Sequence, residues 1–210
     1  MGRLKGQLFP YKDENVSSTR PVVTYALIAA NVLIFLWSLT DYETIIATFG
    51  FTPAALSIVT IFTSMFLHGG FDHLFGNMWF LYIFGDNVED KLGKVKYILF
   101  YLASGIAATL THFATNIGSI IPAIGASGAI SGVLGAYIAM FPKVRVHVAS
   151  YGGAGTVPAY VMIGLWFVLQ LIFGVVSFAG SQGSGIAFWA HIGGFVFGFA
   201  IVKLLYRAKV

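Results

Sequence analysis

Residues 124–141 read IGASGAISGVLGAYIAMF, a run that is apolar enough to enter a bilayer yet carries four glycines and two serines. Glycine at this density lets two helices approach each other closely. Ser127 and Ser131 are the two serines, and a serine in such a run is either a packing residue or a nucleophile. The rest of the chain indicates which reading applies.

The composition indicates a membrane protein. The 210 residues are 58% hydrophobic and only 10% charged, which is too little charge for the surface of a soluble domain. We therefore predict an all-α, polytopic membrane protein that binds the lipid bilayer. There is no cysteine, so disulfides, thiolate catalysis and cysteine metal sites are excluded.

Six apolar runs are long enough, or nearly so, to cross the hydrocarbon core. The predicted spans are 21–40, 72–86, 94–115, 127–141, 157–178 and 187–207. Residues 45–67 could pass for a seventh span, but a seventh span would move the later Lys and Arg clusters to the outside. We therefore predict that residues 41–67 form an external connection that partly enters the interface, which fits Pro53 and the nearby glycines. The predicted organisation is a tail over 1–20, a six-span membrane domain over 21–207 and a second tail over 208–210.

The basic residues fix the orientation. With six spans, all twelve Lys and Arg residues fall on the side of the amino terminus, and the opposite side carries none. Lys and Arg concentrate in short cytoplasmic loops, so both termini are predicted to be cytoplasmic. Because these residues flank apolar runs instead of forming one patch, no nucleic-acid partner is expected. We expect a prokaryotic plasma membrane; the oligomeric state is left open.

Strongly polar side chains inside spans are candidates for function. His68, His73 and Asn77 fall near the outer end of the second span, Ser127 at the outer end of the fourth and His191 near that of the sixth. A serine hydroxyl becomes a nucleophile when a neighbouring histidine takes its proton. The pattern therefore predicts a Ser127–His191 dyad for acyl transfer, near the outer face of the membrane.

An acyl-transfer site also needs donors for the oxyanion of the tetrahedral intermediate. His73 and Asn77 are four residues apart and share a helix face, and the backbone N–H of Ser127 is a third candidate. Small residues should bring the fourth and sixth spans together near this site. The glycines predicted to do so are Gly125, Gly128, Gly132, Gly194 and Gly198.

Taken together, these residues resemble the rhomboid family of intramembrane serine proteases. The matching segments are HGGFDHLFGN (68–77), VEDKLG (88–93), GASG (125–128) and AHIGG (190–194). The resemblance implies that Ser127 attacks a peptide bond of a transmembrane substrate, that His191 is the base and that His73 and Asn77 bind the oxyanion. It also implies that His68 supports the site, and that the fifth span and residues 178–188 form a gate and cap.

Two departures from the family pattern stand out. Many members carry Trp-Arg in the first external loop, whereas residues 41–56 contain no Arg. Some members place an aromatic residue one turn after the nucleophile, where it packs on the histidine. This chain has Ser131 there, so either another residue orients His191 or the ring is held more loosely.

Three other functions remain as alternatives. A catalytically silent rhomboid-like protein would bind transmembrane helices without cleaving them. A transporter or channel would place its polar residues nearer the midplane and would show an inverted repeat. A metalloprotease could use His68, His73 and His191, but the chain has no H-E-x-x-H motif. The protease prediction includes neither metal nor cofactor, and the substrate's identity stays open.

Overall fold

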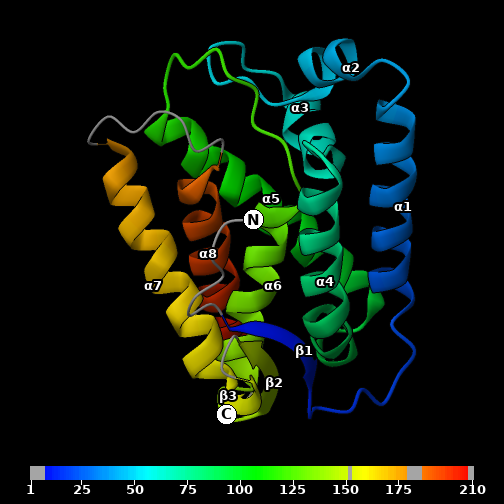
Figure 1. The fold of residues 1–210 in the computed structure, drawn as a ribbon, viewed down its shortest axis with the longest axis vertical. Helices are drawn as coiled ribbons and strands as arrows, with labels where there is room; N and C mark the ends of the chain where they lie inside the picture. Colours follow the sequence, from blue (N-terminus) through cyan, green and yellow to red (C-terminus); the bar gives the residue numbers. More distant parts are fainter. Residues whose placement is uncertain (1–7, 151–152, 179–185, 208–210) are drawn as a thin grey trace.

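A computed structural model describes residues 8–150, 153–178 and 186–207, which form a helical bundle with a small sheet at one end (Figure 1). In chain order the elements are β1 (Phe9–Asp13), α1 (Val22–Ser38), α2 (Tyr42–Phe49), α3 (Ile58–Thr63), the single-turn helix η1 (Ser64–Phe66), α4 (Phe71–Leu92), α5 (Lys94–Thr115), α6 (Ser127–Met140), β2 (Arg145–Ser150), β3 (Gly153–Pro158), α7 (Ala159–Phe178) and α8 (Phe188–Arg207). Each predicted span coincides with one of the six longer helices. The segment between α1 and α4 contains only short, broken helices.

Three of the helices are long and apolar enough to cross a membrane by length and composition. They lie at Lys94–Thr115, Ala159–Phe178 and Phe188–Leu205. Helices α1 and α6 are apolar but shorter, and α4 carries the acidic residues of the 88–93 segment. The protein is mainly helical and has membrane-spanning helices.

Helix α6 lies at the centre of the bundle and packs against α4, α5 and α8. Every residue from Gly128 to Tyr137 is buried. A helix that is apolar on all sides is stable only when other helices surround it, which explains why α6 has no polar stripe. The central position of α6 fixes Ser127, at its first turn, between the neighbouring helices.

Glycines let α6 and α8 touch along their backbones. A Cβ atom built on Gly194 would lie 2.0 Å from the carbonyl oxygen of Gly128. A Cβ on Gly198 would lie 2.1 Å from the carbonyl oxygen of Gly132. Because any side chain at these positions would overlap the opposite helix, glycine sets the distance between the two helices.

The prediction of an all-α fold is wrong at one end of the molecule. Strands β1, β2 and β3 form an antiparallel sheet in that order, and β1 comes from the segment predicted to be a tail. In β2, Val146 and Val148 are buried and alternate with more exposed residues, a period of two that is typical of a strand. The partner strand β1 is more than a hundred residues away, so no local pattern indicates the pairing.

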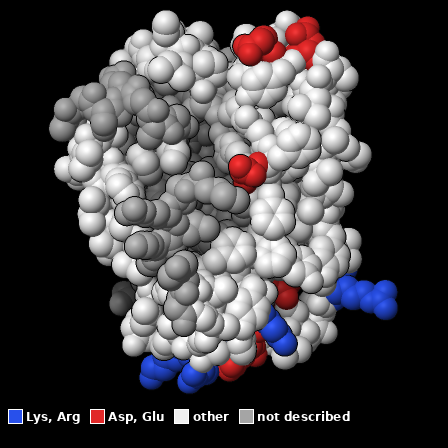
Figure 2. All heavy atoms as spheres, viewed as in Figure 1, with Lys and Arg blue, Asp and Glu red and all other residues white. Residues whose placement is uncertain are grey.

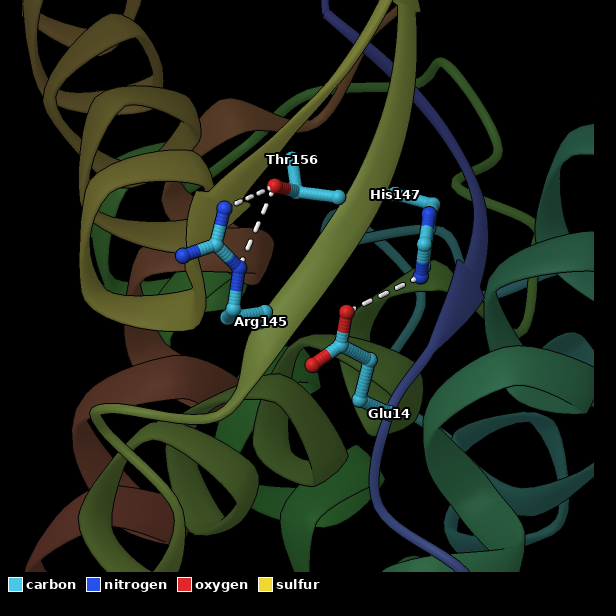
Figure 3. A network of polar contacts seen from close by, with 4 residues as sticks. All are labelled: Glu14, Arg145, His147 and Thr156. Atoms are coloured by element: carbon cyan, nitrogen blue, oxygen red, sulfur yellow. Dashed lines mark hydrogen bonds and ion pairs between the residues drawn. The ribbon is translucent and has the colours of Figure 1, made fainter.

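Polar contacts tie the sheet together on its exposed side (Figure 3). The Nε2 atom of His147 lies 3.2 Å from the Oε1 atom of Glu14, which directly follows β1. Arg145 on β2 donates to the hydroxyl of Thr156 on β3. These contacts link all three parts of the sheet across the surface.

Asp13 joins the sheet to the helices. The Tyr137 hydroxyl on α6 donates to Asp13 Oδ2 at 2.5 Å, and the Asn87 amide on α4 donates to the same atom at 3.1 Å. Burial raises the pKa of Asp13 to about 6, and the nearby carboxylate of Asp86 adds to this rise, although the bond from Tyr137 opposes it. The charged form of Asp13 is therefore costly in the folded state.

We predict that Asp13→Asn removes a pH dependence of stability. Because the folded state binds this proton more tightly than the unfolded state, the wild type should gain stability as the pH falls from about 6 to about 4. That gain should be lost as the pH rises through 6. Thermal unfolding of the wild type and Asp13→Asn in detergent between pH 4.5 and 7 measures this dependence. An unchanged slope in Asp13→Asn would contradict the prediction.

Glu89 on α4 caps the first turn of α1. The side chain is only 1% exposed; Oε1 accepts the N–H of Val23 at 3.0 Å, and Oε2 accepts the N–H and the hydroxyl of Thr24 at 2.7 and 2.8 Å. A carboxylate at a helix amino terminus satisfies N–H groups that have no partner within the helix and complements the helix dipole. The acidic segment 88–93 therefore anchors α1 to α4.

Glu89→Ala should cost about 2–4 kcal/mol of unfolding free energy, because the buried N–H and hydroxyl of Thr24 and the part-buried N–H of Val23 lose their acceptor. Asp90→Asn is the matched control. Asp90 accepts from Ser18 and Thr19, but these bonds are exposed, so the loss there should stay below about 1 kcal/mol. Unfolding by denaturant in detergent compares the two variants. Equal losses of unfolding free energy in the two variants would show that burial of these hydrogen bonds does not determine how much they stabilise the fold.

Candidate active site

Ser127 and His191 meet where α6 and α8 both begin. The Nε2 atom of His191 lies 2.8 Å from the Oγ atom of Ser127, although the two residues are 64 positions apart. Ser127 is the first residue of α6 and His191 lies in the first turn of α8. The glycine contacts between these helices hold the two first turns at hydrogen-bond distance.

Gln170 on α7 contacts the other ring nitrogen of His191. Its Oε1 atom lies 2.8 Å from His191 Nδ1. An amide oxygen only accepts hydrogen bonds, so Nδ1 carries the proton and Nε2 is left to accept the Ser127 hydroxyl proton. The Trp166 ring lies beside the imidazole, with its centroid 6.1 Å away. Gln170 and Trp166 thus lie against the His191 ring, for which the sequence indicated no orienting partner.

Sequence reasoning missed Gln170. Its signal was a strongly polar amide within an otherwise apolar span, AYVMIGLWFVLQLIFGVVSF. Intramembrane polar residues are functional candidates by default, and this rule would have found it. Spacing to the known motifs gave no hint, because contact with His191 depends on how α7 packs on α8.

His73 and Asn77 on α4 form the opposite side of the site. The N–H of Gly69 donates to His73 Nδ1 at 3.3 Å, so in the neutral ring the proton sits on Nε2. A Cβ built on Gly125 would lie 2.8 Å from His73 Nε2 and 3.5 Å from Ser127 Oγ. Gly125 has a φ of 128°, which favours glycine. It thus leaves room for the His73 donor beside the serine.

His68 is fully buried and holds Asn77 in place. The Asn77 amide nitrogen lies 3.0 Å from His68 Nε2. Asn77 has two amide hydrogens, so this bond leaves a second one for a ligand. Asn77, His73, Ser127 and His191 all line one cavity of about 240 Å³. The structure thus gathers all the predicted polar site residues, with His68 behind Asn77.

Two other predictions concern the surroundings of the site. The proposed cap falls mostly on residues 179–185, which lie outside the described part of the chain. Within the described ranges, no group of three or more His, Asp or Glu side chains is arranged to hold a metal ion. Both ring nitrogens of His191, the Nδ1 atom of His73 and the Nε2 atom of His68 contact protein groups.

A family model described as the rhomboid domain matches residues 55–208, more than half of the chain. The human mitochondrial presenilin-associated rhomboid-like protein is 32% identical over 142 residues, covering 64% of this chain and 36% of that protein. Rhomboid protease GluP of Bacillus subtilis is 31% identical over 191 residues, covering 86% of this chain and 34% of that protein.

A yeast relative, the mitochondrial Rhomboid protein 1 of Saccharomyces cerevisiae, is 29% identical over 185 residues, covering 84% of this chain and 51% of that protein. The chain therefore spans about a third to a half of the length of these three relatives. The resemblance drawn from the sequence motifs is confirmed by the family model. The chain belongs to the rhomboid family and is an integral membrane protein.

Proposed function

We propose that the protein is an intramembrane serine protease that cleaves peptide bonds in or near transmembrane segments of other proteins. The observation that carries this proposal is the 2.8 Å contact between Ser127 Oγ and His191 Nε2. The Gln170 amide oxygen, 2.8 Å from His191 Nδ1, favours the Nδ1–H tautomer that a general base requires. A relative named as a rhomboid protease supports the same reaction class.

In the proposed reaction, Ser127 Oγ attacks the scissile carbonyl carbon while His191 Nε2 takes the hydroxyl proton. The oxyanion receives hydrogen bonds from His73 Nε2–H, the Asn77 amide and the Ser127 N–H. His191 then protonates the leaving amine and the C–N bond breaks. Water, deprotonated by His191, hydrolyses the acyl-enzyme to release the carboxyl product and restore Ser127.

We also propose six membrane spans, with both termini in the cytoplasm and the site in the outer half of the bilayer. Figure 2 supports this orientation: on the face drawn, the described Lys and Arg side chains gather at the end that carries the sheet. The opposite end of this face shows Asp and Glu but no described Lys or Arg. Location in a prokaryotic plasma membrane stays a prediction, and the relatives include mitochondrial proteins.

Labelling with a fluorophosphonate or isocoumarin probe tests the proposal without needing a substrate. The expected result is one covalent adduct, located on Ser127 by peptide mass spectrometry. Ser131→Ala is the matched control and should still be labelled, because the Ser131 hydroxyl donates to the backbone oxygen of Ser127 at 2.6 Å. A folded wild type that is not labelled, yet binds transmembrane peptides, would instead indicate a catalytically silent rhomboid-like protein.

A further inference from the structure

We propose that Gln170, on α7, is a positioning residue that orients His191 and completes a hydrogen-bonded chain Ser127–His191–Gln170. This inference rests on the proposed function. The Gln170 amide oxygen accepts from His191 Nδ1 at 2.8 Å, and His191 Nε2 faces Ser127 Oγ at the same distance. Three side chains from α7, α8 and α6 thus form one line of hydrogen bonds.

The placement of Gln170 argues for a specific role. An amide in an apolar span is costly unless it is hydrogen-bonded, so a packing role alone would favour a leucine. The neighbours Leu169 and Leu171 show that this part of α7 accepts apolar side chains. The amide oxygen instead lies against His191 Nδ1, and a proton held on Nδ1 leaves Nε2 free to accept one from Ser127.

A neutral acceptor suits this environment. Among the residues that the structure describes, both ring nitrogens of His191 contact neutral groups, Ser127 Oγ and Gln170 Oε1. A carboxylate in place of the amide would be a buried charge in an apolar span, with a large desolvation cost. The amide fixes the ring and its tautomer without that cost. It also fills the role left open by the absence of an aromatic residue at Ser131.

Helix α7 has one side that packs on α8 and another that is exposed. The buried residues of α7 are Ala159, Met162, Ile163 and Gly174, and most of them lie near the sheet end. On either side of Gln170, Val168, Leu169, Ile172 and Phe173 are exposed, as expected for a helix that faces lipid. On the opposite side of α7, Phe167 stacks on Phe195 of α8, and the Gln170 amide contacts His191 within this packed surface, where it orients the ring.

The test compares Gln170→Leu, which removes the acceptor at similar volume, with Gln170→Glu, which keeps a carbonyl oxygen in either protonation state. We expect Gln170→Leu to lower kcat about 10–100-fold with little change in KM, because a misoriented base costs rate without weakening substrate binding. Gln170→Glu should restore most of the rate, because a carboxyl group in this apolar span stays protonated and its carbonyl oxygen still accepts from His191 Nδ1. Ser177→Ala is the control on α7, since within the described part of the chain the Ser177 hydroxyl donates to the Gly174 carbonyl of its own helix and not to α8.

A spectroscopic measurement keeps the inference separate from the proposed activity. In protein with 15N-labelled histidine, the wild type should show His191 as the Nδ1–H tautomer, and Gln170→Leu should lose that single form. If the wild type cleaves no substrate, the protease proposal fails while the tautomer still tests Gln170. Gln170→Leu with wild-type kcat and an unchanged His191 tautomer would overturn the inference, as would equal losses in Gln170→Leu and Gln170→Glu.

Discussion

Ser127→Ala should reduce peptide-bond cleavage to the background rate while the protein remains folded. Removing the nucleophile of a serine protease costs about 10⁴–10⁶-fold in kcat. Among the described residues, the Ser127 hydroxyl has one side-chain hydrogen-bond partner, His191 Nε2 at 2.8 Å, so alanine removes no other polar contact between helices. Alanine is a good helix former, so α6 should begin at the same place.

The measurement is cleavage of a model transmembrane substrate in detergent or liposomes by wild type, Ser127→Ala and His191→Ala in parallel. The two variants should be equally silent, and the double variant no slower than either, because the pair acts as a unit. Ser131→Ala, one turn along the same helix, should stay active. Cleavage by Ser127→Ala at the wild-type rate would end the protease assignment.

Gly198→Val should disrupt the bundle itself. A Cβ at Gly198 would lie 2.1 Å from the Gly132 carbonyl oxygen and 2.7 Å from its Cα. These are backbone atoms of a buried helix, so the clash is relieved only if α6 and α8 move apart. We expect a loss of at least about 3 kcal/mol in unfolding free energy, and loss of cleavage as Ser127 and His191 separate.

Gly164→Ala provides the matched control, because nothing lies within 4 Å of a Cβ at Gly164 on α7. That variant should be neutral or slightly more stable, since alanine favours a helix over glycine. Thermal unfolding and cleavage are measured for both variants and the wild type. If Gly198→Val melts with the wild type and keeps its activity, the close contact of α6 and α8 is not what holds the dyad together.

The helices and the family could be predicted from the sequence because their signals are local. Apolar runs marked all six longer helices, and the short motifs around Ser127 and His191 identified the rhomboid family. The contact between these two residues was inferred from their matching depth and from the glycines. Depth alone does not fix lateral neighbours, so the 2.8 Å distance required the structure.

The features that escaped prediction all depend on contacts between distant parts of the chain. Strand β1 pairs with β2 more than a hundred residues later, and Asp13 reaches Tyr137 across 124 positions. Gln170 meets His191 only because of the rotation of α7 about its axis. Neither residue type nor spacing encodes that rotation, which is set by packing against α8.

The shortness of α6 has a consequence for how water could reach the serine. With 14 residues, α6 is about 21 Å long, against about 30 Å for the hydrocarbon thickness of a bilayer. Because other helices surround α6, lipid chains do not have to adapt to its short length. If Met140 lies at one interface, Ser127 lies about 9 Å below the other interface. The longer helices around α6 then surround a depression with Ser127 at its base. A truncated central helix thus makes hydrolysis at membrane depth geometrically possible.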